Sequence, residues 1–445
     1  MRWRMISLLA PALLAAAAAA TSEGAKPVAS FRDFDKVKQV GGLPEGWQTW
    51  APRPEIAPRF SVAAKSGRRG GGALRIDGVG KPAAYGAWQR RIGGIVPGSR
   101  YRLSAYFRAE GVPYQRRSVA ARLEWLDDRG KRARPPDYAL EAGREGEWVR
   151  IEHRAEAPAN ARTVVLSLAL GWAPRGTVWW DDIELAEETA PRDRVVRVAT
   201  IYHRPSGTKS ASESVEQFCR VLEGAAALRP DLACLPEGIT VIGTGKSYAE
   251  VSEPVPGPTT AKLGAAARKL HSYIVAGLYE RAGPAVYNTA VLIDRNGGLA
   301  GKYRKTHLPY EEAEAGLTPG DSYPVFRTDF GAVGLLICWD VQFPEPARAL
   351  ALAGAELIAL PIWGGNEVLA RARAIENHVF LATSSYDMKT FIVDPAGAVL
   401  AEASAAQPVA LAEIHLDRKI VQPWLGDMKP RTWKERRPDI AGPQR

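Results

Sequence analysis

The pattern of apolar positions changes near residue 190. Before it, apolar and polar side chains alternate in short runs, which are separated by clusters of glycine, proline and aspartate. Residues 101–107 and 119–125 each place an apolar side chain at every second position, which is typical of a strand with one buried face. Similar runs span residues 148–153, 164–170 and 177–185. Because helical spacing is absent here, the pattern predicts an all-β sandwich of two sheets.

Beyond residue 195 the pattern predicts strands that alternate with helices. Residues 195–201 and 232–235 are short apolar runs, and residues 212–227 between them repeat apolar side chains at helical spacing. Further strands are expected at residues 273–279, 290–293, 332–337, 357–362 and 409–415, and further helices at 261–271, 347–353 and 369–378. This alternation predicts an α/β layered domain with buried sheets. In such folds functional side chains follow the ends of strands.

The start of the chain has the character of an export signal. Two arginines precede an apolar stretch and an alanine run that contains an Ala-x-Ala cleavage site, so residues 1–20 predict a cleaved signal peptide and a secreted or periplasmic protein. A membrane anchor is the alternative, but the apolar stretch, which Pro11 interrupts, is shorter than the about 20 residues that cross a bilayer. The expected domains are then a sandwich at 28–188, a polar linker at 189–194 and an α/β domain at 195–440.

Composition narrows the classes of function. The formal net charge is +10, and almost all of this excess lies in residues 24–190. No nucleic-acid-binding motif accompanies it, and an anionic glycan or cell-surface polymer fits the basic half at least as well. Three cysteines are too few for a disulfide framework. The histidines and cysteines lack the spacing of metal ligands, so we expect neither a metal nor another cofactor.

Three residues follow apolar runs of the second half: Glu237, Lys305 and Cys338. Taken singly, each has an ordinary structural interpretation, as a strand-edge carboxylate, a surface cation or a small buried thiol. Together they supply what hydrolysis of an amide through a covalent step requires, namely a base, a cation for the developing oxyanion and a strong nucleophile. Cys219 and Cys234 are interpreted as inert thiols of the core.

These residues lie in motifs similar to those of the nitrilase superfamily of carbon-nitrogen hydrolases, over residues 195–438. The motifs are Leu235-Pro236-Glu237, Tyr287-Asn288-Thr289-Ala290, Tyr303-Arg304-Lys305-Thr306-His307-Leu308, Leu317-Thr318-Pro319-Gly320, Ile337-Cys338-Trp339-Asp340, Phe343-Pro344-Glu345, the run from Arg371 to Asn377, and the run from Glu435 to Asp439. The resemblance implies a four-layer αββα sandwich and a Glu-Lys-Cys triad of Glu237, Lys305 and Cys338. It also implies a second glutamate after the lysine, for which Glu312 is favoured and Glu314 is the alternative.

Each of these residues has an expected role. Glu237 takes the thiol proton, passes it to the departing amine and then activates water. Lys305 and the backbone N–H of Trp339 hold the oxyanion, and the nearby cation is expected to lower the pKa of Cys338. Glu312 orients Lys305 or a substrate amine. Two residues that follow the strand at 357–362 are expected to line the substrate pocket, Trp363 and Asn366.

Departures from the superfamily pattern bear on the substrate. Nitrilases usually follow the cysteine with Trp-Glu, whereas Trp339-Asp340 resembles the amidase branches, so an amide is preferred to a nitrile. Dicarboxylate ω-amidases tend to carry an arginine at the position of Gln342, so a substrate carboxylate is not expected there. Open alternatives are an N-carbamoyl amidohydrolase, a nitrilase, and a non-catalytic carbohydrate-binding protein on the same scaffold.

The β-rich half resembles the jelly-roll carbohydrate-binding modules of secreted hydrolases in the runs at 60–64, 72–77, 96–106 and 178–185. Its many aromatic residues either fill the core or stack on sugar rings. Four that lie off the clearest strands are expected to contact a glycan: Trp47, Trp50, Tyr85 and Trp88. The expected partners are a small amide and a glycan or cell-surface polymer, without nucleic acid. The superfamily resemblance also implies a homo-oligomer, in which the basic tail at 429–445 packs across a partner.

Overall fold

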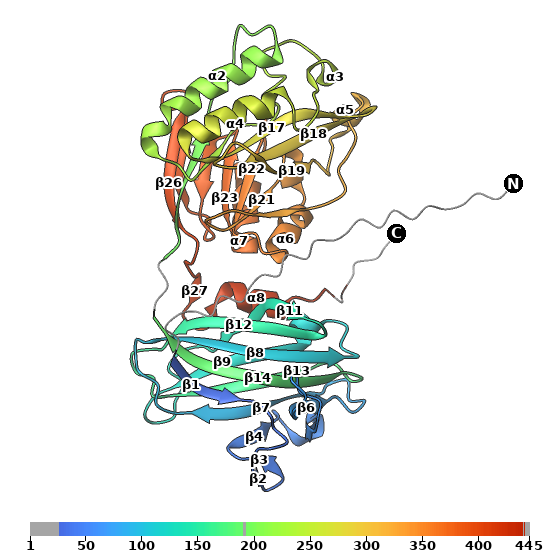
Figure 1. Ribbon diagram of the computed structural model, residues 1–445, viewed down its shortest axis with the longest axis vertical. Helices are drawn as coiled ribbons and strands as arrows, with labels where there is room; N and C mark the ends of the chain where they lie inside the picture. Colours follow the sequence, from blue (N-terminus) through green and yellow to red (C-terminus); the bar gives the residue numbers. More distant parts are fainter. Residues whose placement is uncertain (1–25, 190–192, 439, 441–445) are drawn as a thin grey trace, which may run out of the picture. The chain divides into compact units, whose positions relative to one another are not determined.

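The computed structural model describes residues 26–189, 193–438 and 440 (Figure 1). The chain divides into two compact units, a β-sheet unit of residues 1–190 with 433–445 and an α/β unit of residues 191–432. The expected signal peptide at 1–20 lies outside the described residues. No helix in the described part of the chain is long and apolar enough to cross a bilayer.

The β-sheet unit contains two antiparallel sheets, with strand orders β11-β12-β8-β14-β6-β5, where β1 also pairs with β14, and β10-β9-β13-β7-β4. One hydrophobic core joins them and includes the fully buried rings of Tyr101, Trp125 and Trp180. The strands are β1 (Lys26–Phe31), β4 (Trp47–Trp50), β5 (Arg59–Ala63), β6 (Ala73–Asp77), β7 (Tyr85–Ile92), β8 (Arg100–Glu110), β9 (Val119–Leu126), β10 (Asp137–Tyr138), β11 (Leu140–Glu145), β12 (Trp148–Glu156), β13 (Thr163–Gly171) and β14 (Thr177–Glu188), with a small hairpin β2 (Gln39–Val40) and β3 (Leu43–Pro44) and two single turns η1 (Pro54–Ile56) and α1 (Gln115–Ser118). The expected sheet-rich N-terminal half is confirmed.

Two of the four residues expected to contact a glycan belong to the core. Trp88 is fully buried, and its Nε1 donates to the carbonyl of Arg75 at 3.1 Å. Trp47 is 5% exposed and makes edge contacts with two phenylalanine rings. The expectation was wrong for both. Thr49 on β4 lies opposite Trp88 on β7. Because every second residue of a strand points to the same face, Trp47 lies on the same inward face as Trp88. Trp50 and Tyr85 occupy the opposite face.

The last helix, α8 (Met428–Glu435), is divided between the units after Thr432. Trp433 and Lys434 are both buried, and the Nζ of Lys434 donates to the carbonyl of Val119 at 2.9 Å. Burial lowers the pKa of Lys434 to about 8. These residues of the basic tail therefore pack into the β-sheet unit of their own chain, and the second unit ends before the expected limit at residue 440.

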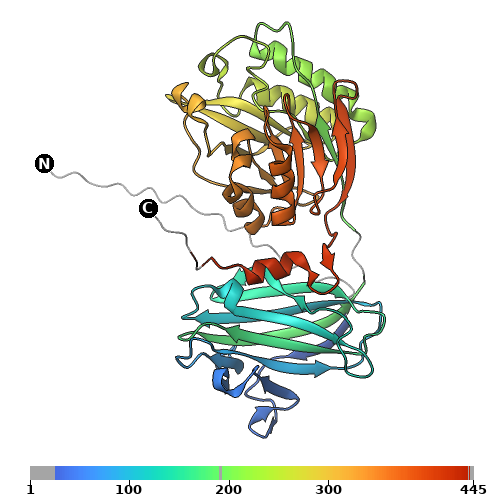
Figure 2. The ribbon, with the colours of Figure 1, turned by 180° about the vertical axis from the view of Figure 1, so that it is seen from behind.

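The α/β unit contains two six-stranded sheets, with orders β19-β18-β17-β16-β15-β26 and β20-β21-β22-β23-β24-β25. One core lies between the sheets, and a second lies between the first sheet and helices α2 and α4, which run side by side in both views (Figures 1 and 2). Helices α6 and α7 pack against β21 and β23 of the second sheet. The strands are β15 (Val195–Ile201), β16 (Leu232–Cys234), β17 (Tyr273–Ala282), β18 (Ala285–Ile293), β19 (Leu299–Arg304), β20 (Val325–Arg327), β21 (Ala332–Leu335), β22 (Leu357–Pro361), β23 (Phe380–Ser384), β24 (Thr390–Val393), β25 (Val399–Ala403) and β26 (Val409–His415), with the short pair β27 (Val421–Gln422) and β28 (Gly426–Asp427); the helices are α2 (Ala211–Gly224), η2 (Ala226–Leu228), α3 (Tyr248–Val251), α4 (Pro258–Leu270), α5 (Tyr310–Glu314), η3 (Cys338–Gln342), α6 (Pro344–Leu352) and α7 (Glu367–Asn377).

Parallel strands at the centre of each sheet determine where polar side chains gather. Strands β15, β16 and β17 are parallel, as are β21, β22 and β23. Their carboxyl ends share one edge in each sheet, so the residues that follow β16, β21 and β22 emerge close together. Those residues are Glu237, Cys338 and Trp363.

A buried carboxylate, Asp137, lies at the edge of the second sheet of the β-sheet unit. It accepts hydrogen bonds from Trp125 Nε1 at 2.7 Å and Arg134 at 2.5 Å, and His153 Nε2 lies 3.5 Å from its other oxygen. Burial alone would raise the pKa of Asp137, but the hydrogen bond and charge of His153, with Arg134 and Trp125, lower it to about 2.

We predict that Asp137 makes the β-sheet unit acid-sensitive. A carboxyl whose pKa falls on folding stabilises the folded state above its unfolded value of 3.8, and this contribution is lost as the pH falls toward 2. Asp137→Asn should lower the free energy of unfolding at pH 7 by about 2 kcal/mol and flatten its change between pH 4 and 2. Denaturant unfolding monitored by tryptophan fluorescence measures both. The exposed Asp128→Asn is the control, and an equal effect there would contradict the assignment.

Candidate active site

A buried cluster of charges joins three of the four predicted catalytic residues. The Nζ of Lys305 lies 3.1 Å from Oε1 of Glu237 and 2.8 Å from Oε1 of Glu312. Lys305 and Glu237 are only 1% and 2% exposed, so their charges are little screened by water. Glu312 lies on α5 and is also buried, whereas the alternative candidate Glu314 is exposed. The structure therefore favours Glu312.

Both oxygens of Glu237 are held in place. Asn288 on β18 is fully buried and donates from Nδ2 to Glu237 Oε1 at 2.7 Å and to Glu312 Oε1 at 3.2 Å. The backbone N–H of Trp363 donates to Glu237 Oε2 at 2.9 Å, and the hydroxyl of Tyr386 donates to the Glu237 carbonyl at 2.9 Å. Asn288 lies in one of the superfamily motifs, which gives a signal for it in the sequence, whereas no motif marks Tyr386.

Cys338 is the first residue of the short 3-10 segment η3, and two residues separate it from the end of β21. Its φ of 43° lies in the left-handed region, which non-glycine residues adopt at a cost. The thiol donates to the carbonyl of Gly364 at 3.7 Å. Trp339 follows within η3, which is the position expected for its backbone N–H to meet an oxyanion at the cysteine.

The electrostatics of the thiol differ from our expectation. Burial raises the pKa of Cys338, and the charge and hydrogen bond of Glu237 raise it further, against the opposing effect of Lys305. Lys305 does act to lower this pKa, as expected, but burial and the neighbouring carboxylate outweigh it, so the net shift is upward. Burial would lower the pKa of Lys305, but the charges of Glu237, Cys338 and Glu312 raise it, so the lysine stays protonated.

Glu312 has one oxygen that is not committed within the protein. Its Oε1 meets Lys305 and Asn288, whereas its Oε2 is buried without a hydrogen-bond partner among the described residues. Burial raises the pKa of Glu312, and Glu237 adds to this effect while Lys305 opposes it. Since a buried unpaired oxygen is costly, Oε2 is suited to accept a hydrogen bond from a bound molecule.

The two predicted pocket residues have different positions. Trp363 lies beside the cluster. Its backbone N–H donates to Glu237, and its ring centroid lies 5.1 Å from that of Tyr386. Asn366 instead caps α7, because its Oδ1 accepts from the backbone N–H groups of Val368 and Leu369 at 2.8 and 3.4 Å. Capping commits this side chain to the start of the helix.

The other two thiols lie apart from the cluster. Burial raises the pKa of Cys234, which is fully buried in β16, and that of the half-buried Cys219 on α2. Neither thiol belongs to the cluster of Glu237, Lys305 and Glu312, which supplies the base that a buried thiol needs in order to ionise. Across the described ranges, no three histidine, cysteine or acidic side chains form a group that could hold a metal ion.

Comparison with known proteins agrees with this arrangement. A profile described as carbon-nitrogen hydrolase matches residues 197–422. Omega-amidase NIT2 of Homo sapiens is 31% identical over 249 residues, which are 50% of this chain and 89% of that protein. Deaminated glutathione amidase of Mus musculus is 29% identical over 296 residues, or 57% and 90% of the two chains.

Solved structures give the same kind of match. An amidase from Nesterenkonia sp. is 26% identical, with a TM-score of 0.45, over 52% of this chain and 95% of that one. A carbon-nitrogen hydrolase from Helicobacter pylori G27 is 26% identical with the same TM-score, over 51% and 91%. These scores are too low to add to the assignment. The profile spans half of the chain, and with the omega-amidase match it shows that the chain belongs to the carbon-nitrogen hydrolase family, the nitrilase superfamily, and is a hydrolase of carbon–nitrogen bonds other than peptide bonds.

Proposed function

We propose that this protein hydrolyses a primary amide through a thioester on Cys338. The observation that carries the proposal is the buried cluster in which Lys305 is bonded to both Glu237 and Glu312, and in which the charges of Glu237 and Lys305 act on the Cys338 thiol. The cluster combines a proton acceptor, a fixed cation and a nucleophile in one site.

Formation of the acyl-enzyme begins with proton transfer. Because the pKa of Cys338 is raised, the resting thiol keeps its proton until Glu237 accepts it as Sγ attacks the amide carbon. The carbonyl oxygen becomes an oxyanion, which the Lys305 ammonium and the backbone N–H of Trp339 stabilise. The tetrahedral intermediate then collapses, the carbon–nitrogen bond breaks, and the proton on Glu237 moves to the nitrogen, which leaves as ammonia.

Release of the acid repeats these steps with water. Glu237 takes a proton from water as its oxygen attacks the thioester carbon, the same two donors hold the new oxyanion, and the carbon–sulfur bond breaks. The thiolate recovers its proton from Glu237. The bonds from Asn288 and from the Trp363 backbone keep the carboxylate in one orientation through both halves of the reaction.

Two features support a primary amide. The uncommitted Oε2 of Glu312 can accept one N–H of a carboxamide, and the relatives named above are amidases. Gln342 supplies no cation to bind the free carboxylate of a dicarboxylic ω-amide. Such ω-amides are therefore the second candidate class of substrate. N-carbamoyl compounds and nitriles are the remaining alternatives.

We predict that ammonia release singles out one amide class. The protein without residues 1–20 is assayed on primary amides, ω-amides, N-carbamoyl compounds and nitriles. Cys338→Ala should reduce kcat at least about 1,000-fold without loss of folding, because the covalent step needs the thiol. Cys219→Ala, on α2, is the matched control and should keep full activity. Activity that survives Cys338→Ala would contradict the mechanism.

We predict opposite effects of Glu237 and Lys305 on the thiol. The pH midpoint for alkylation of Cys338 by iodoacetamide should fall in Glu237→Gln, because a charge that raises the pKa is removed, and rise in Lys305→Met. Peptide mass spectrometry separates Cys338 from Cys219 and Cys234. Both variants should also lose turnover. Shifts in the same direction would refute the assigned electrostatics.

We further propose export of the protein, on the basis of residues 1–20, and binding of a glycan by its β-sheet unit. The candidate contact, here called the aromatic surface, consists of Trp50, Tyr85 and Trp172 with Arg117 and Arg122. The ring centroid of Tyr85 lies 6.1 Å from that of Trp50 and 5.1 Å from that of Trp172. Trp172 is 49% exposed at a φ of 54°, which is strained for a bulky residue.

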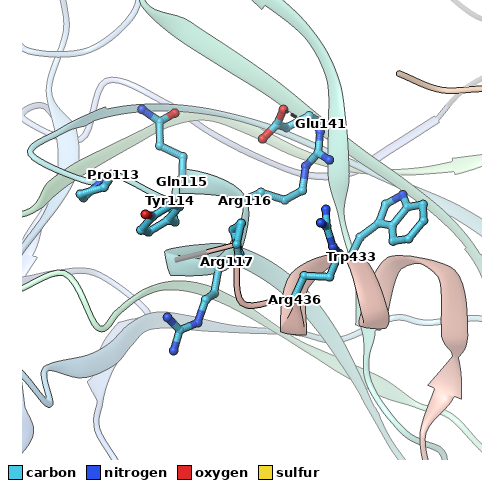
Figure 3. A pocket seen from close by; sticks show the side chains of 9 residues that line it. Pro113, Tyr114, Gln115, Arg116, Arg117, Glu141, Trp433 and Arg436 are labelled. Atoms are coloured by element: carbon cyan, nitrogen blue, oxygen red, sulfur yellow. Dashed lines mark ion pairs between the residues drawn. The ribbon is translucent and has the colours of Figure 1, made fainter. Parts of the chain in front are cut away.

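Cations flank these rings. The guanidinium carbon of Arg117 lies 4.7 Å from the Trp172 ring, and that of Arg122 lies 5.7 Å from the Trp50 ring. The turn α1, which carries Arg117, also borders a pocket of about 310 Å³ (Figure 3). The pocket is lined by Arg116, Arg436 and Glu141 among others, and Arg116 forms an ion pair with Glu141. Aromatic faces beside arginines suit sugar rings that carry carboxylates.

We predict that the aromatic surface binds an anionic polysaccharide. In affinity electrophoresis, polygalacturonate should slow the protein more than uncharged hydroxyethylcellulose, and increasingly so at low salt. Trp50→Ala with Trp172→Ala should weaken retention at least about threefold, because the stacking area is lost. Trp424→Ala removes an exposed tryptophan of the α/β unit and should change nothing. Retention that is absent in the wild type, or unchanged in the double variant, would overturn the proposal.

A further inference from the structure

A buried carboxylate links the segment of the nucleophile to the segment of the lysine. Asp340, the third residue of η3, is fully buried. Its Oδ2 accepts from the Tyr303 hydroxyl at 2.8 Å and the Ile337 backbone N–H at 3.0 Å. Its Oδ1 accepts from the Thr306 hydroxyl at 3.2 Å and the His307 backbone N–H at 3.1 Å, and lies 3.2 Å from His307 Nδ1.

These donors lie on both sides of the site. Tyr303, Thr306 and His307 flank Lys305 in sequence, and Ile337 directly precedes Cys338. One carboxylate is therefore bonded to the chain that carries the ammonium and to the chain that carries the thiol. Among the described residues its one ion-pair partner is His307, so nearly all of its stabilisation comes from hydrogen bonds to these two segments.

The other end of η3 is also fixed. Arg373 on α7 is buried and donates from Nε to the Val341 carbonyl at 3.1 Å and from Nη2 to the Gln342 carbonyl at 3.3 Å. With Asp340 near the start and Arg373 at the end, the turn is held between two buried charges. A residue at positive φ, such as Cys338, persists only where its surroundings fix the backbone in this way.

We infer that Asp340 is a positioning residue for the hydrolysis, and that it sets the separation between Cys338 Sγ and Lys305 Nζ. The inference rests on the proposed function for its kinetic consequence. Asp340 touches neither the thiol nor the ammonium, so its removal acts on the covalent steps through the geometry of those two groups. Substrate binding, which relies on other side chains, is left nearly unchanged.

Replacement by asparagine isolates this role. Asp340→Asn exchanges one acceptor oxygen for an NH₂ group, which then faces either the Tyr303 and Ile337 donors or the Thr306 and His307 donors. In either orientation one of the two segments is released. Asp394 provides a matched control, because it is also buried and accepts from two backbone N–H groups and Arg418, at 2.9, 2.9 and 3.1 Å, but in the β24–β25 turn.

The test compares Asp340→Asn with Asp394→Asn in the full-length protein. Asp340→Asn should lower kcat about 100-fold with KM within about threefold, and raise the pH midpoint of Cys338 alkylation as Lys305 moves away. Asp394→Asn should leave kcat and the alkylation midpoint unchanged, whatever its thermal stability. Tyr303→Phe removes one donor only and should lower kcat about tenfold; it replaces Asp340→Asn if that variant does not fold.

The outcomes separate this inference from the proposed function. Equal losses of kcat in the two asparagine variants, or an unchanged alkylation midpoint in Asp340→Asn, would overturn the positioning role. If the wild type hydrolyses no amide while the midpoint still shifts in Asp340→Asn alone, the proposed substrate class fails and the positioning role stands, because alkylation does not depend on a substrate.

Discussion

The ammonium of Lys305 makes the rest of the site possible. Glu237 and Glu312 are both buried and share the same hydrogen-bond partners. Two carboxylates so close together and so far from water repel one another and resist ionisation. A single buried cation between Glu237 and Glu312 offsets that repulsion, and its own pKa rises as a result. Burial of such a cluster is tolerated only where every member is fixed by hydrogen bonds, which explains why Asn288 lies between the same two carboxylates.

The fold delivers these groups from separate elements. Glu237, Cys338 and Trp363 follow strands of two different sheets, Lys305 comes directly after β19, and Glu312 lies on a short helix. Each of them lies in a connection or short helix that follows a strand, so its position depends on the packing of the two sheets. The two sheets therefore act as a rigid support for a site built from their connections.

Much of this organisation could be predicted from the sequence. Periodicity identified β15 and β26 at their observed bounds, and the motifs identified Glu237, Lys305, Cys338 and Glu312. Other features depend on neighbours that are distant in sequence. The direction of the pKa shift at Cys338 depends on how deeply the thiol is buried beside Glu237. Strand register turned Trp47 and Trp88 inward, and a helix start committed Asn366 to capping.

The hydrogen bond between Lys434 and Val119 spans 315 positions of the chain. During synthesis, the strands of the β-sheet unit emerge long before the residues that complete it, and the whole α/β unit is made in between. The closure entropy of so long a loop rises only slowly with its length, so the delay itself costs little stability. The delay affects the order of folding. The surface of α1 and β9 stays uncovered until residues 433 and beyond are made, which happens only after the whole α/β unit has left the ribosome.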